Sequence, residues 1–194
     1  MKPKLRKRTK LVQGVGINDA DYIVTRKVNG KKTECHFYTS WKNMLTRCYS
    51  ETFHKIQPTY IDCTVSSEWL IFSRFKSWME VQDWKGKHLD KDILIKNNKV
   101  YSSSTCIFVT RDVNTLLHKN LKQRGPHPIG VTFEASKYKA LCSTQGKRRY
   151  LGHYETPEEA HEAYKAFKYK YIAEIASQQS EPLRTALLNY VIEP

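Results

Sequence analysis

The stretch that decides the fold is residues 129–176, IGVTFEASKYKALCSTQGKRRYLGHYETPEEAHEAYKAFKYKYIAEIA. Turn residues divide its first part into three runs with strand-like composition. These runs are residues 129–133, 137–144 and 147–154. Thr156, Pro157 and Glu159 then form a capping box with proline at the first helical position, which predicts a helix to about Ala176. We therefore expect a three-stranded antiparallel sheet backed by one helix.

Alternation along these strands predicts what each face of the sheet carries, because successive side chains of a strand point to opposite sides. Val131, Phe133, Ala140 and Cys142 suit the side that faces the helix. The opposite side would be basic and exposed, as a surface that contacts a phosphate-lined DNA groove requires. The candidate DNA-contacting residues there and near the hairpin tip are Thr132, Lys137, Lys139, Ser143, Lys147, Arg148, Arg149 and Tyr150. The alternative is that residues 147–149 are only a basic hairpin tip.

Motifs in their order along residues 130–176 suggest a family. They are Gly130-Val131, Tyr138-Lys139-Ala140, Gly146-Lys147, Leu151-Gly152-His153-Tyr154, Thr156-Pro157-Glu158-Glu159-Ala160 and Ala163-Tyr164. With them the region resembles the Apetala-two/ethylene-response-factor DNA-binding domain, in the form found in phage proteins. The resemblance implies a sheet that lies in the DNA major groove and a helix that braces its back. Thr132 and Ser143 stand where the family usually has arginines. This departure weakens the expectation of base-specific contacts more than the expectation of DNA binding.

Upstream, the pattern predicts a hairpin and two apolar helices. Asn29-Gly30 favours a type I′ turn between strands at residues 22–25 and 35–37. A helix capped by Thr39 or Ser40 would bury one stripe, and a helix capped by Ser66 or Ser67 would bury another. The first stripe is Tyr38, Trp41, Met44, Leu45 and Cys48, and the second is Trp69, Phe72, Phe75, Trp78 and Met79.

Residues 88–117 predict a compact ββα unit. A strand over 88–94 is followed by a turn at 97–99, a strand over 100–109 and a short helix that holds Asn114. Within 41–117 the chain carries Trp41-x-x-Met44-x-x-Arg47-Cys48-Tyr49, Cys63-x-Val65-x-x-Glu68-Trp69, Phe72-x-x-Phe75, Leu89-Asp90-Lys91-Asp92, Asn98-Lys99-x-Tyr101-Ser102 and Cys106-x-Phe108-Val109. With these pieces it resembles an HNH-endonuclease-like module of phages. The resemblance implies a metal-dependent nuclease core related to homing endonucleases.

The candidate catalytic residues of this module are His88, Asp90, Asp92 and Asn114. An HNH nuclease needs a general-base histidine and a metal ion held by neighbouring side chains. Lys91 occupies the position expected for that histidine, so the resemblance by itself does not predict nuclease activity. If Asp90 and Asp92 share a strand face, their carboxylates could hold Mg²⁺, the cofactor of an active module. A salt-bridged or capping role for the two aspartates is the alternative.

Charge and cysteine content narrow the function classes. The chain has 33 Lys and Arg against 19 Asp and Glu in 194 residues, and six of these bases fall in the first ten residues. A polyanionic partner is expected, with double-stranded DNA ahead of a membrane because no amphipathic basic helix is evident. No apolar run approaches the ~20 residues of a membrane span. The five cysteines form no C-x-x-C pair, which favours a reducing, cytoplasmic setting. The phage resemblances imply that this is the cytoplasm of an infected bacterial cell.

We expect an α+β chain with a basic arm (1–20), an HNH-like ββα module (21–118), a linker (119–128), and an Apetala-two-like domain plus C-terminal helix (129–194). The leading hypothesis is a phage-type protein that binds double-stranded DNA and carries a degenerate nuclease module. The alternatives are an active metal-dependent homing-type endonuclease and a phage factor that binds a host protein.

Overall fold

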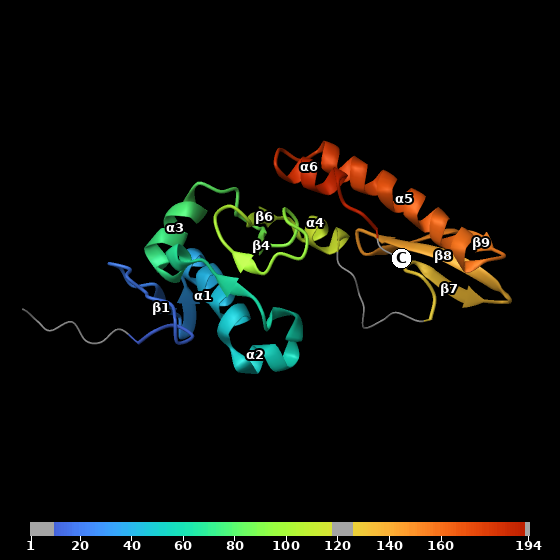
Figure 1. Ribbon diagram of the computed structural model, residues 1–194. Coiled ribbons are helices and arrows are strands. Elements are labelled where there is room, and N and C mark those ends of the chain that lie inside the picture. The colour runs from blue at the N-terminus through green and yellow to red at the C-terminus, as the bar shows by residue number, and fades with distance from the viewer. Residues whose placement is uncertain (1–9, 118–125, 193–194) are drawn as a thin grey trace, which may run out of the picture. The chain divides into compact units, whose positions relative to one another are not determined.

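The computed structural model describes residues 10–117 and 126–192. It contains both helices and strands, as the α+β expectation requires, and its contacts divide the chain into two units, Met1–Val109 and Thr110–Pro194 (Figure 1). The first nine residues of the expected basic arm and residues 119–125 of the expected linker lie outside the described residues. The division falls nine residues before the module boundary expected after residue 118, since the short helix after Val109 belongs to the second unit.

The elements of the first unit are β1 (Thr25–Val28), β2 (Lys31–Glu34), α1 (His36–Tyr49), α2 (Glu51–Ile56), the 3-10 helix η1 (Pro58–Tyr60), β3 (Thr64–Val65), the 3-10 helix η2 (Ser67–Leu70), α3 (Phe72–Glu80), β4 (His88–Asp90), β5 (Val100–Tyr101) and β6 (Ile107–Val109). Those of the second unit are α4 (Arg111–Leu116), β7 (Val131–Glu134), β8 (Lys137–Thr144), β9 (Lys147–Tyr154), α5 (Pro157–Ser177) and α6 (Leu183–Leu188).

The core of the first unit is built from the two predicted apolar stripes. From α1 it takes Trp41, Met44, Leu45 and Cys48, and from η2 and α3 it takes Trp69, Phe72, Phe75 and Met79. The Trp41 indole donates a hydrogen bond of 2.6 Å to the Trp69 carbonyl oxygen, so its one polar atom is satisfied inside the core. These aromatic side chains therefore serve packing.

The second predicted helix is divided into η2 and α3 at Ile71. Its backbone is extended, because residues on either side of it bond to Ile17: the Ile17 amide donates to the Leu70 carbonyl, and the Phe72 amide donates to the Ile17 carbonyl. A bridge to a segment more than fifty residues earlier cannot be seen in a local pattern.

The N-terminal hairpin forms around Asn29-Gly30, and both residues have positive φ, as the type I′ prediction requires. Its strands are Thr25–Val28 and Lys31–Glu34, whereas the sequence pattern placed them at residues 22–25 and 35–37. A two-residue turn brings its immediate neighbours into register, so the strands flank it directly. His36 consequently begins α1, and the cap residue is Cys35 in place of Thr39 or Ser40.

The predicted ββα order is present, but its second strand is divided. β4 pairs with β6 in antiparallel fashion, while β5 pairs with β3 in parallel. The Thr105 hydroxyl causes the break, since it donates to the Val100 carbonyl at 2.7 Å and accepts from the Ser102 amide at 3.1 Å. Such side-chain bonds to the local backbone compete with strand pairing.

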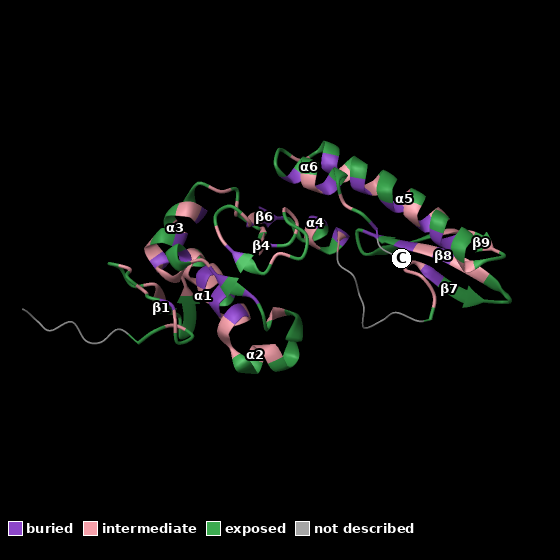
Figure 2. Ribbon diagram, viewed as in Figure 1, coloured by how far each residue is buried: buried purple, intermediate pink, exposed green. Residues whose placement is uncertain are grey.

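In the second unit, β7, β8 and β9 form one antiparallel sheet with α5 along one face (Figure 1). The predicted capping box is confirmed: the Glu159 amide donates to the Thr156 hydroxyl at 3.2 Å, and the Thr156 amide donates to the Glu159 carboxylate at 3.3 Å. The side of α5 toward the sheet is buried and its other side is exposed (Figure 2). The core between helix and sheet includes Val131, Ala140 and Ala160.

Phe133 departs from the expected helix-facing core. It is 55% exposed, although Val131 on the same face is buried. Phe133 lies two residues before the Ala135-Ser136 turn and pairs with Tyr138, and its ring also contacts His127. These rings form a small aromatic cluster at the end of the hairpin, which leaves half of Phe133 in solvent.

Gly130 shows how closely α5 approaches the sheet. Its φ is +83°, and a Cβ built there would lie 2.1 Å from the Tyr164 ring. Gly130→Ala is expected to lower the free energy of unfolding of the second unit by roughly 2–4 kcal/mol, because strain and overpacking add. Gly146→Ala is the control: its φ is also positive, but nothing lies within 4 Å of the new methyl group. Chemical denaturation of both variants should give the larger loss at Gly130, and equal losses would contradict this packing.

Candidate nucleic-acid interface

The strand register assigns each candidate residue to a face of the sheet. Side chains directly opposite each other in an antiparallel pair point to the same side. Ala140 and Cys142 are buried beneath α5, so their neighbours in β8 point away from the helix. The outer face therefore carries Thr132, Lys137, Lys139, Leu141, Ser143, Arg148, Tyr150 and His153.

Arg149 and Lys147 belong to the other side. Arg149 lies opposite the buried Cys142, and its Nε is 3.4 Å from the Thr144 hydroxyl oxygen. Lys147 lies opposite Thr144, which is also buried. Of the eight candidate DNA-contacting residues, these two are directed toward the helix side at the hairpin tip. The other six share the outer face.

A bulge in β9 produces this arrangement. Ala140 pairs with Gly152 and Leu141 pairs with Tyr150, so that Leu151 is an extra residue without a partner in β8. Leu151 packs with the core beneath α5, and Gly152 takes a φ of +137° that a side chain would strain. The bulge resets the alternation, and Tyr150 and Arg148 face outward as a result.

Cations and an aromatic ring lie together on the outer face. The Lys139 ammonium is 5.9 Å from the centroid of the Tyr150 ring and forms a 2.7 Å ion pair with Glu134. That hydrogen bond and charge hold the pKa of Glu134 below its usual range. The Tyr150 hydroxyl lies 2.7 Å from Nδ1 of His153, and the Tyr150 side chain is 57% exposed.

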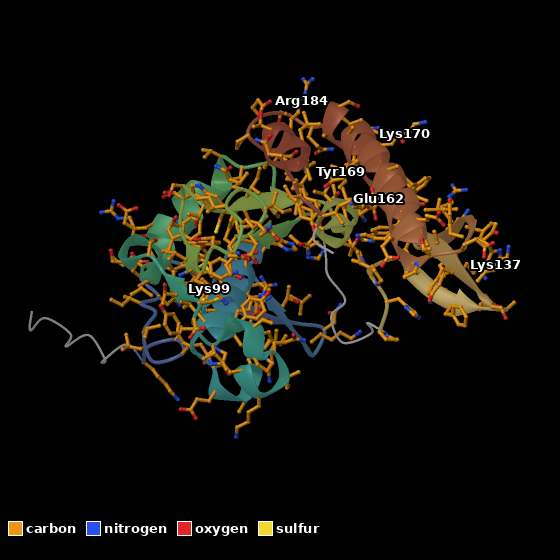
Figure 3. All side chains as sticks on the ribbon, turned by 45° about the vertical axis from the view of Figure 1, so that its right-hand side comes forward. Lys99, Lys137, Glu162, Tyr169, Lys170 and Arg184 are labelled. Carbon is orange, nitrogen blue, oxygen red and sulfur yellow. The ribbon has the colours of Figure 1, made fainter. Side chains whose placement is uncertain are left out.

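The ion pairs on this face are weak enough to exchange for a ligand. Lys137 pairs with Glu155 at 2.7 Å, and both side chains are largely exposed; Figure 3 shows Lys137 at the end of the sheet. Exposed pairs of this kind are worth about 0–1 kcal/mol. Within the described parts of the chain, Arg148 has no acidic partner within ion-pair distance. Its guanidinium is therefore the most available donor on the outer face.

The nuclease-like residues of the first unit have a different geometry from the expected one. The predicted strand over 88–94 ends at Asp90, because Oδ1 of Asp90 accepts the amides of Asp92 and Ile93 at 2.7 and 2.8 Å. The chain turns there, so the prediction that Asp90 and Asp92 share a strand face is wrong. Burial raises the pKa of Asp90 against the effect of these amides.

Lys91 is a buried cation. Only 6% of it is exposed, and its ammonium donates to Oδ1 of Asp92 at 2.5 Å and to the Asn98 carbonyl at 2.9 Å. The rings of Tyr60 and Tyr101 lie 5.8 and 5.9 Å from it. Burial alone would lower the pKa of Lys91, but the hydrogen bond and charge of Asp92 outweigh it and the pKa is raised. The ammonium stays protonated near neutral pH and cannot accept a proton from water.

Both carboxylates make contacts within the first unit. One oxygen of Asp90 accepts two amides, and one oxygen of Asp92 binds Lys91. In residues 10–117 and 126–192, no three His, Cys, Asp or Glu side chains are grouped so that they could hold a metal ion. His88 is exposed on β4, and Asn114 lies on α4 in the second unit. Of the four candidates, Asp90 and Asp92 lie together at the turn that follows β4, on either side of Lys91.

Sequence reasoning missed the role of Arg47 beside this group. Its guanidinium lies 6.0 Å from the Tyr60 ring centroid and interacts electrostatically with Tyr101 and Asp90. Arg47 lies off the apolar stripe of α1, and a half-buried arginine there gives no signal in hydrophobic periodicity. Arg47 and Lys91 together place two cations around Tyr60 and Tyr101.

Lys91 is expected to support the fold of the first unit. Lys91→Ala should lower the free energy of unfolding by roughly 2–4 kcal/mol, because it opens a cavity and removes the donor from the Asn98 carbonyl. Lys91→Met keeps most of the volume, so its cost should be less than half as large. Urea denaturation followed by tryptophan fluorescence measures both. Two variants as stable as the parent would show that Lys91 has no structural role.

Comparison of the chain with models of protein families, with curated proteins and with solved structures gives no match. Among the described helices, none combines the length and the apolar character needed to cross a membrane. The function is therefore inferred from the geometry of the chain itself.

Proposed function

We propose that the protein binds double-stranded DNA and that the outer face of the β7–β8–β9 sheet is the contact surface. The observation that carries the proposal is the group of Lys139, Arg148 and Tyr150 on one exposed face, while α5 occupies the opposite face. The resemblance to the Apetala-two domain supports the same surface.

The side chains of this face suit the DNA major groove. A planar arginine fork such as that of Arg148 can donate two hydrogen bonds to one guanine or bind a phosphate. Lys137 and Lys139 can exchange their exposed carboxylate partners for phosphates, and such contacts position a protein on the duplex. The side chains of Thr132 and Ser143 are shorter than that of arginine, and their hydroxyls can donate or accept a hydrogen bond, so they discriminate less between bases. We infer that this surface binds mainly the phosphates of the DNA backbone and makes few base-specific contacts.

We infer further that this binding is not accompanied by cleavage through the HNH-like constellation. The general-base position holds Lys91, whose ammonium is kept protonated, and the two aspartates are engaged by backbone amides and by that ammonium. The proposal is a phage-type DNA-binding protein with a degenerate nuclease module, acting in the cytoplasm of an infected bacterial cell. A host-protein partner has no specific observation in its favour.

Two adjacent arginines on opposite faces of β9 provide the test. Arg148→Gln should weaken binding to duplex DNA about 5- to 160-fold, because a good bidentate contact is worth about 1–3 kcal/mol. Arg149→Gln removes the same charge from the helix side and should change the affinity much less. Fluorescence anisotropy with labelled duplex measures both dissociation constants. Equal losses, or a larger loss for Arg149→Gln, would contradict the outer-face assignment.

Cleavage is tested separately, with supercoiled DNA and Mg²⁺ or Mn²⁺. The full-length protein is expected to leave the DNA intact at concentrations that saturate binding. Metal-dependent nicking that disappears in Asp90→Ala would instead establish the active-endonuclease alternative.

A further inference from the structure

The β1–β2 hairpin of the first unit carries a second basic surface, which the Apetala-two-like sheet does not include. Residues 25–34, TRKVNGKKTE, contain the cations Arg26, Lys27, Lys31 and Lys32 and a single carboxylate, Glu34. All four cations are exposed. At the base of the hairpin the Cys35 amide donates to the Val24 carbonyl at 2.8 Å, and Val24 packs on the core of the unit. The hairpin is thus fixed at its base and exposed along its arms.

The register distributes these cations over both faces. Lys27 lies directly opposite Lys32, so these two share one face, while Arg26 and Lys31 share the other. Glu34 pairs with Lys32 at 2.8 Å and also with Lys42 of α1. In the described parts of the chain, no carboxylate lies within ion-pair distance of Arg26, Lys27 or Lys31. The hairpin therefore has a large positive excess close to its turn.

Packing does not account for this composition. Neither face of the outer hairpin is covered, so the cations neither bury surface nor shield a core. Like charges directly opposite each other weaken a strand pair, and a two-stranded hairpin has little stability to lose. A bound polyanion would relieve the repulsion between Lys27 and Lys32.

We propose that this hairpin is a second contact for duplex DNA, inserted as a two-stranded ribbon into a groove. The major groove is wide enough for such a ribbon, and its two walls are lined by phosphates. Cations on both faces match two walls. An anionic membrane lies on one side only and favours an apolar face, whereas Val28 is the one apolar residue in this hairpin. The inference rests on the proposed function for the choice of DNA, but on separate residues.

The test removes the four charges and keeps the turn. The variant is Arg26→Gln, Lys27→Gln, Lys31→Gln and Lys32→Gln in the full chain, with Asn29, Gly30 and Glu34 retained. Its matched control loses the same charge at four other exposed sites, Lys55, Arg74, Lys85 and Lys170, each changed to Gln. Circular dichroism and thermal unfolding establish that both are folded.

Dissociation constants for a random-sequence duplex are measured across a range of salt concentrations. Each phosphate contact contributes about 0.9 to the slope of log affinity against log salt, so the hairpin variant should lose about 2–4 from the slope. The control should lose less than half as much. Two double variants, Arg26→Gln with Lys31→Gln and Lys27→Gln with Lys32→Gln, should each produce a part of the loss, because each face meets one wall.

The outcomes separate the two proposals. If Arg148→Gln weakens binding and the hairpin variant behaves like its control, the hairpin inference is overturned and the sheet proposal stands. If the hairpin variant loses affinity and Arg148→Gln does not, the sheet proposal fails and the hairpin inference stands. A parent protein that does not bind duplex overturns both. Loss of binding to anionic phosphatidylglycerol vesicles, with duplex binding unchanged, would identify the hairpin as a membrane contact and overturn the inference.

Discussion

A single extra residue in β9 determines which side chains the sheet presents to solvent. Leu151 has no partner in β8 and packs in the core beneath α5, so the alternation is shifted by one residue between Gly152 and Tyr150. Without this bulge, a regular register from Gly152 would direct Tyr150 and Arg148 toward the helix. The outer face would then lose its aromatic ring and its arginine fork. Leu151 packs beneath α5, which holds the bulge in place. The bulge in turn determines which side chains form the candidate interface.

The same sequence uses its cations in two ways. On the outer face of the sheet, Lys137 and Lys139 hold exposed carboxylate partners that a ligand could replace, and Arg148 is exposed. On the β1–β2 hairpin all four cations are exposed. In the first unit, Lys91 is buried among Asp92, the Asn98 carbonyl and two tyrosine rings. The exposed cations suit a polyanion, whereas Lys91 serves the packing of the first unit.

Local signals allowed much of the second unit to be predicted. β8 and β9 have the predicted bounds, Lys137–Thr144 and Lys147–Tyr154, because turn residues and a capping box mark their ends. The faces of Lys147 and Arg149 could not be predicted, since a bulge depends on the register between strands. In the first unit the apolar stripes were informative. The ends of β4 and β5 could not be predicted from the sequence, because they depend on hydrogen bonds from the Asp90 and Thr105 side chains to the backbone.

Photo-crosslinking from the sheet itself tests whether the outer face meets DNA. A benzophenone amino acid replaces Thr132, which is exposed on the outer face, or Ala173, which is exposed on α5. Both full-length variants are irradiated with labelled duplex at the same fractional saturation. The outer-face model predicts a strong protein–DNA crosslink from position 132 and little from position 173. Crosslinking from position 173 alone, with both variants still bound, would contradict it.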